Sequence, residues 1–359
     1  MNLGQAGGRD ENNPEDFVTK TILSRTLLSA VSVGAALIAG PQAGTAQDIV
    51  KKPETNPMEV VPTQRAKVLA EGGSDRVIGG RLADKGEWPF QIALLASNSL
   101  DDSPQSQLNA QFCGGSLIAP QWVLTAAHCS VDDSAKAYDP QLATVLVGAT
   151  NLAEGKRYAI AEIIVHEGYS PITFDNDVAL IKLKEPAADQ PTIALTDGTL
   201  PDDSGKATLI GWGLMEDGSA PVDLMEAEMG VFPRQACNDG IRGYFRDGIK
   251  MTLDAQAPSM HIDENAIKYA MEVIDAGLGD PLSERMICAG TPSGEYSSCN
   301  GDSGGPLFVT GDKGPVQIGV VSWGAGPVDS TSFCGHENAY AVYARVSAFR
   351  DWIREKSGI

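Results

Sequence analysis

The chain has 359 residues, of which 42% are hydrophobic and 21% charged, and it contains 39 glycines and 21 prolines. This composition excludes a disordered chain and indicates a packed fold that is rich in loops. The formal net charge is −20, and the part after residue 76 carries 38 acidic residues against 19 basic ones. Such a surface repels nucleic acid and anionic membranes. It attracts cationic polypeptides, although solubility is the simpler explanation of the charge.

The first 46 residues resemble an export signal. Lys20 and Arg25 precede the apolar run Leu27–Ala39, and small residues follow that allow cleavage after Ala46. The run is short for a helix that spans a membrane. We therefore expect a signal peptide over residues 1–46 and a secreted product, extracellular or periplasmic, with no membrane span in its mature form. A membrane anchor at the apolar run is the alternative.

The next segment, residues 47–76, is polar and contains three prolines with almost no apolar periodicity, which predicts a linker or propeptide. From residue 77 onward, short runs rich in β-forming residues alternate with clusters of Gly, Pro, Asn and Asp. This texture predicts an all-β sandwich or barrel over 77–359. The runs are Phe90–Leu95, Trp122–Ala126, Thr144–Val147, Ala159–Val165, Val178–Leu183, Ala207–Trp212, Gln317–Trp323 and Ala339–Val346.

Two segments break the β pattern. Apolar residues at helical spacing predict a helix over Ile262–Ala276, with Asp263 as its N-cap and Gly277 at its C′ position. A second amphipathic helix is expected over Val346–Lys356, with Ser347 as its cap. We expect this last helix to pack on the body of the fold.

Six cysteines are present, and none stands at C-x-x-C or zinc-finger spacing. Their even number and wide spacing favour disulfides formed in an oxidising compartment. Spacing alone leaves about 15 connectivities open. The cysteines are Cys113, Cys129, Cys237, Cys288, Cys299 and Cys334.

Three short motifs stand in chain order: Thr125–Cys129 (TAAHC), Asp175–Leu180 (DNDVAL) and Gly301–Pro306 (GDSGGP). Taken alone, each has an ordinary explanation as a packed histidine, a turn aspartate or a flexible glycine loop. Together they predict a catalytic triad of His128, Asp177 and Ser303.

The chemistry explains why these residue types belong together. A serine hydroxyl attacks only when a base removes its proton, and imidazole suits that role because its ordinary pKa is near 6.5. A buried carboxylate fixes the tautomer of the imidazole and stabilises the imidazolium that forms. Glycines beside the serine let backbone N–H groups reach the developing oxyanion. We assign those two donors to Gly301 and Ser303.

These motifs, one of them in a longer form and with three others, resemble the chymotrypsin/trypsin family of serine proteases over nearly all of 77–359. The further motifs are Phe112–Ile118, Gln121–Cys129, Gly211–Gly213 and Val321–Gly324. The resemblance implies two antiparallel six-stranded β-barrels with the triad between them and a C-terminal helix. It implies the disulfides Cys113–Cys129, Cys237–Cys288 and Cys299–Cys334. It also implies that Ser322, Trp323 and Gly324 form the edge that pairs with an extended substrate.

The sequence Arg76–Gly80 resembles the activation junction of the family. Cleavage after Arg76 would free the amino group of Val77, which would pair with Asp302 and bring the oxyanion loop into its working shape. The chain is therefore expected to be a zymogen whose propeptide is 47–76. An exposed loop without this role is the alternative.

The resemblance places six residues at the substrate pocket: Ser297, Ser298, Asn300, Trp323, Gly324 and Ala341. Ser297 stands where trypsin-like members carry an acidic residue, and a neutral pocket disfavours an unpaired lysine or arginine. We therefore expect cleavage after Phe, Tyr, Leu or Met in a pocket made shallow by Ala341. Specificity for Arg or Lys is the alternative, because the lengthened loop 327–333 could bring Asp329 or Glu337 into the pocket. An apolar pocket would also require a second protease for activation.

Two departures from the family remain. An insertion of about 238–284 separates Cys237 from Cys288, and it is expected to be either an exosite or lid, or a tolerated surface loop. The short segment Gly148–Arg157 predicts no bound calcium, and the triad needs no metal or cofactor.

A catalytically silent relative acting as a binding or adhesion module is the alternative function. A lipase fold is rejected because its triad order is Ser, Asp, His.

Overall fold

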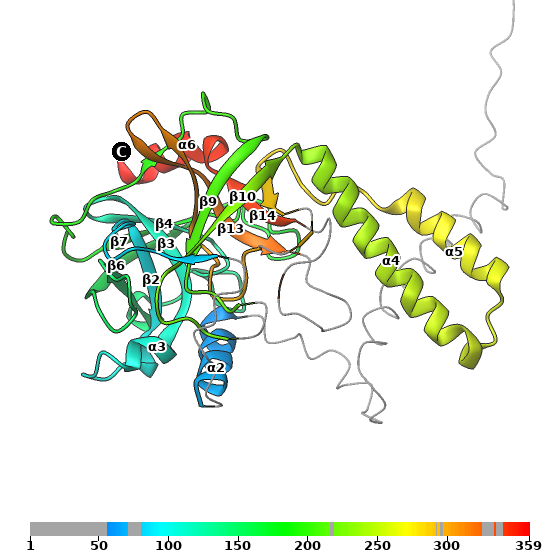
Figure 1. Ribbon diagram of the computed structural model, residues 1–359, viewed down its shortest axis with the longest axis horizontal. Coiled ribbons are helices and arrows are strands. Elements are labelled where there is room, and N and C mark those ends of the chain that lie inside the picture. The colour runs from blue at the N-terminus through cyan, green and yellow to red at the C-terminus, as the bar shows by residue number, and fades with distance from the viewer. Residues whose placement is uncertain are drawn as a thin grey trace, which may run out of the picture. The chain divides into compact units, whose positions relative to one another are not determined.

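The computed structural model describes residues 56–70, 80–215, 219–291, 293–294, 297–324, 334 and 340–359 (Figure 1). The predicted signal peptide, residues 76–79 of the activation junction and the loop 327–333 lie outside these residues. By their contacts the described residues fall into two compact units, one within Glu54–Arg246 and Ile274–Ile359 and one within Asp247–Val273. Both barrels belong to the first unit.

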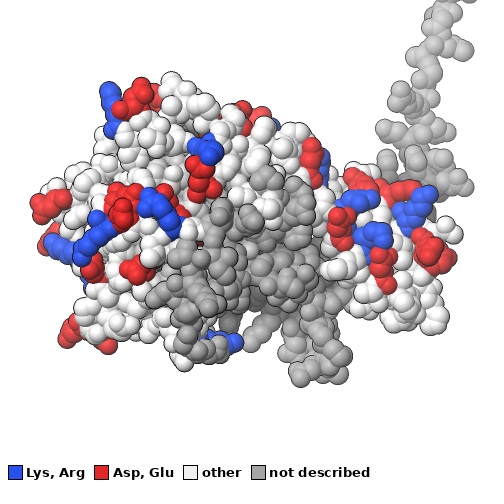
Figure 2. Space-filling model, in the orientation of Figure 1, with Lys and Arg blue, Asp and Glu red and all other residues white. Residues whose placement is uncertain are grey.

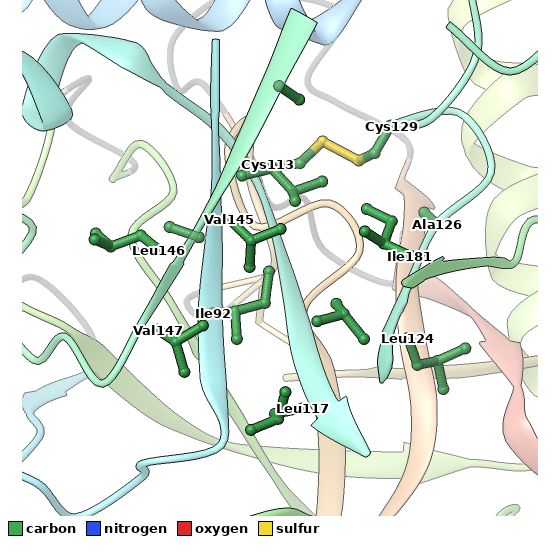
Figure 3. Close-up of a cluster of buried hydrophobic side chains, with 14 of the residues drawn as sticks. Ile92, Cys113, Leu117, Leu124, Ala126, Cys129, Val145, Leu146, Val147 and Ile181 are labelled. Atoms are coloured by element: carbon green, nitrogen blue, oxygen red, sulfur yellow. A yellow bond between two sulfur atoms is a disulfide. The ribbon is translucent and has the colours of Figure 1, made fainter. Parts of the chain in front are cut away.

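The first barrel is a closed antiparallel sheet in the order β2-β3-β4-β7-β6-β5. Its strands are β2 (Gln91–Ala96), β3 (Gln111–Ala119), β4 (Trp122–Thr125), β5 (Ala143–Val147), β6 (Lys156–Val165) and β7 (Ala179–Leu183). Figure 3 shows the aliphatic side chains that fill its interior, including Ile92, Leu117 and Val145, none of which is exposed to solvent. The Cys113–Cys129 disulfide lies among them. Because this core fixes the ends of the strands, the loops that leave those ends have defined positions.

The second barrel closes in the order β9-β10-β11-β14-β13-β12, with β12 paired back to β9. Its strands are β9 (Gly205–Gly211), β10 (Met225–Phe232), β11 (Met286–Gly290), β12 (Pro306–Gly311), β13 (Gly314–Gly324) and β14 (Ala341–Arg345). Two short strands extend the sheet: β1 (Arg81–Leu82) pairs with β10, and β8 (Ala194–Leu195) runs parallel to β13. The prediction of two six-stranded antiparallel barrels is confirmed.

The predicted C-terminal helix is α6 (Val346–Ser357), which buries Val346, Phe349 and Ile353 and ends at Gly358 in the left-handed region. The predicted cap is wrong. Ser347 lies inside the helix, where its hydroxyl donates to Asp202, and the residue before the helix makes no side-chain cap.

The insertion consists of α4 (Arg234–Met260) and α5 (Glu264–Gly277). Helix α5 was predicted, and Asp263 caps it by accepting a hydrogen bond from Ala266 N at 2.8 Å. Gly277 is the last helical residue rather than a C′ glycine. Helix α4 was not predicted, because its sequence contains three glycines and Pro258, all of which disfavour a helix interior. Ion pairs from Arg242 to Asp280 and from Arg246 to Asp275 join the base of this hairpin.

The segment 47–76, for which we predicted no helix, contains α2 (Pro57–Ala70). This helix packs on the barrels and buries Val61 and Arg65. Sequence periodicity missed it because the centre of its buried face is an arginine rather than an apolar residue. The remaining described helices are short: α3 (Ser106–Ala110), η2 (Ser97–Ser99) and η3 (Pro140–Leu142).

All three disulfides implied by the family resemblance are formed: Cys113–Cys129, Cys237–Cys288 and Cys299–Cys334. On the face drawn in Figure 2, acidic side chains lie beside basic ones rather than in one block. Pairs such as Arg81–Glu87 and Lys206–Glu228 are exposed and therefore stabilise the fold only slightly. This mixed surface favours solubility as the role of the acidic composition.

Candidate active site

His128 and Asp177 come from loops at neighbouring strand ends of the first barrel. Strand β4 ends three residues before His128, and β7 begins two residues after Asp177. The two strands pair with Thr125 opposite Ala179, so the loops start side by side. The fold therefore brings together two residues that are 49 positions apart in the chain.

Asp177 is completely buried and holds His128 at two points. The backbone N–H of His128 donates to Oδ1 at 2.9 Å, and Nδ1 lies 2.7 Å from Oδ2. Because an ionised carboxylate only accepts hydrogen bonds, the Nδ1 atom carries the proton and Nε2 is the basic nitrogen. Phe174 packs edge-on against the imidazole, with 5.7 Å between ring centroids. The arrangement fixes both the tautomer and the orientation of the ring.

The second barrel contributes a third donor to the same carboxylate. The hydroxyl of Ser322, on β13, donates to Asp177 Oδ2 at 2.5 Å and is itself buried. We predicted Ser322 only as part of the edge that pairs with substrate. Its side chain also links β13 to the aspartate of the first barrel, and the predicted substrate edge stays a prediction.

Contacts between the barrels also support the loop that carries Asp177. Arg285 Nη1 donates to Asn176 Oδ1 at 2.6 Å, and Ser283 Oγ donates to Asp175 Oδ1 at 2.6 Å. Asn176 has a φ of 58°, a left-handed conformation that asparagine tolerates better than most residues. These contacts join the loop of Asp177 to the segment that precedes β11 in the second barrel.

Ser303 lies in the loop before β12, against the first barrel. Its carbonyl accepts a hydrogen bond from Gly114 N at 2.7 Å. The next residue, Gly304, has a φ of 82°, and a Cβ there would lie 2.2 Å from Thr125 Oγ1. Only glycine allows this approach, which sets the serine loop beside the end of β4 that leads to His128. Among the described residues, no hydrogen bond joins Ser303 Oγ to His128 Nε2. Such contacts are often long before substrate binds.

The predicted oxyanion donors lie in the same loop. Gly301 has a φ of 103°, and its carbonyl accepts a hydrogen bond from Gln111 Nε2 at 2.8 Å. Within the described part of the chain, the N–H groups of Gly301 and Ser303 have no protein acceptor. Gln111 was not singled out from the sequence, and it fixes the orientation of the peptide at Gly301.

Asp302 is a second buried carboxylate, next to the serine. Its oxygens accept hydrogen bonds from Gly213 N at 2.8 Å and Cys299 N at 3.0 Å. Burial raises its pKa from 3.8 to about 6, although these two bonds and the positive charge of Arg65 oppose the shift. Its predicted partner, the amino group of Val77, lies outside the described residues.

The residues predicted for the substrate pocket lie on the adjoining segments of the second barrel. Gly324 pairs with Ala341 across β13 and β14, and Ala341 is buried. Ser297 and Ser298 are half-buried before Cys299, Trp323 is half-buried on β13, and Asn300 is exposed. Asp329 and Glu337 lie outside the described residues.

A cluster of Cys113, His128 and Cys129 has the composition of a metal site. Both sulfurs are joined in a disulfide and carry no thiolate, so the cluster cannot bind a metal through them. The disulfide instead positions His128, since it links Cys113 in β3 to Cys129, the residue that follows the histidine.

Two closed antiparallel barrels with a C-terminal helix and a His–Asp pair held from both barrels define a chymotrypsin-like fold. The family model Trypsin matches residues 77–353. The chain belongs to the trypsin family of serine proteases.

Curated relatives agree with this membership. A suppressor of tumorigenicity 14 protein homolog from Bos taurus is 32% identical over 298 residues, which cover 79% of this chain and 28% of that protein. Transmembrane protease serine 11G from Mus musculus is 32% identical over 292 residues, which cover 79% of this chain and 56% of that protein. Transmembrane protease serine 11C from Mus musculus is 30% identical, with 54% of its length covered. The chain therefore spans little more than half, or less, of these relatives.

The prediction of a freely secreted product is contradicted by these relatives, because two of them are named transmembrane proteases. We drew it from the length of the apolar run Leu27–Ala39, which lies outside the described residues. No helix in the described part of the chain has the length and apolar character that a membrane span requires.

Proposed function

We propose that the protein is a serine endopeptidase that hydrolyses peptide bonds through an acyl-enzyme. The observation that carries this proposal is the buried carboxylate of Asp177, which accepts from the backbone and Nδ1 of His128 and from Ser322. A carboxylate that accepts from Nδ1 of an imidazole leaves Nε2 unprotonated and able to act as the base. A packed structural histidine would not need three donors on a buried acid.

The reaction follows from these groups. Ser303 Oγ attacks the substrate carbonyl carbon while His128 Nε2 takes the hydroxyl proton. Asp177 stabilises the imidazolium, and the N–H groups of Gly301 and Ser303 bind the oxyanion. The imidazolium then protonates the departing amine as the C–N bond breaks. A water molecule, deprotonated by the same imidazole, attacks the acyl-enzyme and releases the acid and Ser303.

Cleavage after Arg76 is the proposed activation step. The support for it is Asp302, whose buried carboxylate accepts from two backbone N–H groups of the described residues and whose pKa is raised by burial. A buried carboxylate in this state is stabilised by a cation, and the freed ammonium of Val77 would supply one. The propeptide in this scheme is 47–76.

For specificity we propose an apolar side chain before the scissile bond. No acidic residue stands at position 297, and Ala341, which is buried and pairs with Gly324 across β13 and β14, stands where family members with large pockets usually carry glycine. Peptides that differ only at this position would test it. We expect Phe, Tyr, Leu or Met to be cleaved at least ten-fold faster than Arg, and a preference for Arg would contradict the proposal.

The triad is tested by labelling the full chain with a serine-directed phosphonate after cleavage at Arg76. The adduct is expected on Ser303, and His128→Ala should lower both labelling and peptide hydrolysis by about 10⁴-fold. His261→Ala is the matched control, since that histidine is exposed at the turn between α4 and α5. Equal activity of the two variants, or an adduct at another serine, would exclude this mechanism.

A further inference from the structure

Arg65, in the middle of helix α2, is completely buried. Its guanidinium donates to three backbone carbonyls: Nε to Leu108 O at 2.8 Å, Nη1 to Trp212 O at 2.7 Å and Nη2 to Pro221 O at 2.9 Å. Leu108 lies in α3 beside the first barrel, and the other two acceptors belong to the connection between β9 and β10 of the second. One side chain of the predicted propeptide therefore joins segments of both barrels.

The positive charge of Arg65 is compensated by a carboxylate that it does not contact directly. No carboxylate lies within ion-pairing distance of it among the described residues, and burial lowers its pKa to about 10, so it stays charged at neutral pH. The Trp212–Gly213 peptide connects it to Asp302: the carbonyl accepts from Arg65, and the N–H of Gly213 donates to the Asp302 carboxylate. Arg65 and Asp302 also attract each other electrostatically. The arginine is thus coupled to the residue beside Ser303.

The same face of α2 covers the loop that leads to the serine. Val61, Gln64, Arg65 and Val68 share this face at helical spacing. Val68 packs against Leu214, Ala220 and Cys299. A Cβ on Gly301 would point to Val61 Cγ1 at 3.6 Å, and Asn300 Nδ2 lies 3.4 Å from Gln64 Oε1. Residues Cys299–Gly301 therefore rest on the helix.

The segment 47–76 contains no cysteine, and all six cysteines of the chain are paired in disulfides. After cleavage at Arg76 no covalent bond would connect α2 to the barrels. Whatever holds the helix must be non-covalent, and the buried arginine with its three acceptors is the strongest anchor on its inner face.

We propose that helix α2 stays bound to the protease after activation cleavage, as a non-covalent segment anchored by Arg65, and that it supports the oxyanion loop Cys299–Ser303. This inference rests on the proposed cleavage after Arg76. The surface it assigns is a binding site for an arginine-bearing helix, whose occupant is the chain's own propeptide. The opposite view is that α2 is a leader that departs once the junction is cut.

The experiment compares the full chain with Arg65→Met and with Lys67→Met, a matched control that removes an exposed charge from the same helix. Each protein is cut at Arg76 by limited digestion with an added trypsin-like protease, and the cut is verified by mass. Size-exclusion chromatography and native mass spectrometry then measure whether the fragment ending at residue 76 remains bound.

We expect the fragment to stay with the wild-type and Lys67→Met proteins and to dissociate at least ten-fold faster from Arg65→Met. Phosphonate labelling of Ser303 should fall at least ten-fold in Arg65→Met and stay unchanged in the control. Equal retention in all three proteins, or loss of the fragment from the wild type, would overturn the inference. Retention of the fragment is measured by mass and does not depend on labelling. If Ser303 stays unlabelled in every sample, the proposed function is refuted, and the retention measurement still tests the inference.

Hydrogen–deuterium exchange on the wild type covers the case in which Arg65→Met does not fold. If α2 stays bound, the backbone amides of 57–70 stay protected from exchange after the cut, with protection factors within ten-fold of those in the uncut chain. Exchange of these amides at the rate of a free peptide after the cut would overturn the inference.

Discussion

Two carboxylates of this protein are buried near the serine, and they are held in different ways. Asp177 accepts hydrogen bonds from the backbone and ring of His128 and from the hydroxyl of Ser322. Asp302 accepts from two backbone N–H groups, and burial raises its pKa to about 6. The donors to the first acid come from the loop after β4 and from β13, whereas those to the second come from the connection after β9 and from the loop that precedes Ser303.

The difference shows how one fold assigns separate tasks to the same chemical group. Around Asp177, a side chain from each barrel converges on one oxygen, so the acid is a fixed point against which an imidazole is oriented. Around Asp302, uncharged amides leave part of the cost of burying a negative charge uncompensated. Because of that remaining cost, a nearby cation stabilises the ionised form of Asp302, whether the cation is an arginine or a new amino terminus.

Replacing the first acid tests its role in orienting the imidazole. Asp177→Asn keeps the size of the side chain but removes the charge and offers an N–H donor to Nδ1, which favours the wrong tautomer. We expect kcat/KM for a peptide substrate to fall by about 10⁴-fold with little change in KM. A fall of less than ten-fold would mean that Asp177 serves packing alone, and Asp133→Asn, on the surface, is the control.

Replacing the second acid tests the cost of burial through pH. Because the folded-state pKa of Asp302 lies above 3.8, the uncut folded chain binds more protons than the unfolded chain between about pH 4 and pH 6. Its free energy of unfolding should therefore fall as pH rises through this window. The Asp302→Asn variant lacks this loss, so the stability of the wild type relative to the variant should drop by about 2.5 kcal/mol between pH 4 and pH 7.

Denaturant unfolding of both uncut proteins across that range measures the effect. Asp133→Asn controls for the general effect of removing a carboxylate, since that residue is exposed. A difference between wild type and Asp302→Asn that stays constant from pH 4 to pH 7 would show that the acid is fully compensated in the fold.

The smallest effect concerns the link between the barrels. Ser322→Ala removes one donor to Asp177, and a hydrogen bond to a charged group contributes about 1.5–3 kcal/mol. We expect a decrease of about ten-fold in kcat/KM and a shift in the pH profile of kcat/KM, since the acid that stabilises the imidazolium is altered. Ser99→Ala, an exposed hydroxyl, is the control. An unchanged pH profile would limit Ser322 to a structural role.

The barrels could be predicted because the sequence pattern of a strand is local and recurs along the chain. Runs such as Trp122–Ala126 and Val178–Leu183 correspond to β4 and β7, since alternating or continuous apolar residues bounded by turns define a strand in a barrel. Helix α5 was found through its capping aspartate and apolar stripe. Helices α2 and α4 were missed, because an arginine at the centre of one buried face and glycines with a proline in the other contradict the pattern that marks a helix.

Part of the site could also be predicted, because its motifs are local in the sequence. Motifs name His128 and Asp177, and the structure joins them directly. The contribution of Ser322 to Asp177 and of Gln111 to Gly301 depends on register between distant segments, 145 and 190 positions apart. Nothing near these residues in the chain indicates such a partner. Local pattern can identify chemical groups, but only tertiary structure shows which group orients another.

The disulfide Cys237–Cys288 closes the insertion at its root. Its cysteines lie at the first turn of α4 and in β11, and Asn238 Oδ1 accepts from Leu282 N at 2.9 Å between them. The two chain ends at this point are fixed in space whatever the intervening residues do. The disulfide ties the first turn of α4 directly to β11 of the second barrel, so the segment between the two cysteines, 51 positions long, is a closed loop whose two ends are joined independently of its own helices.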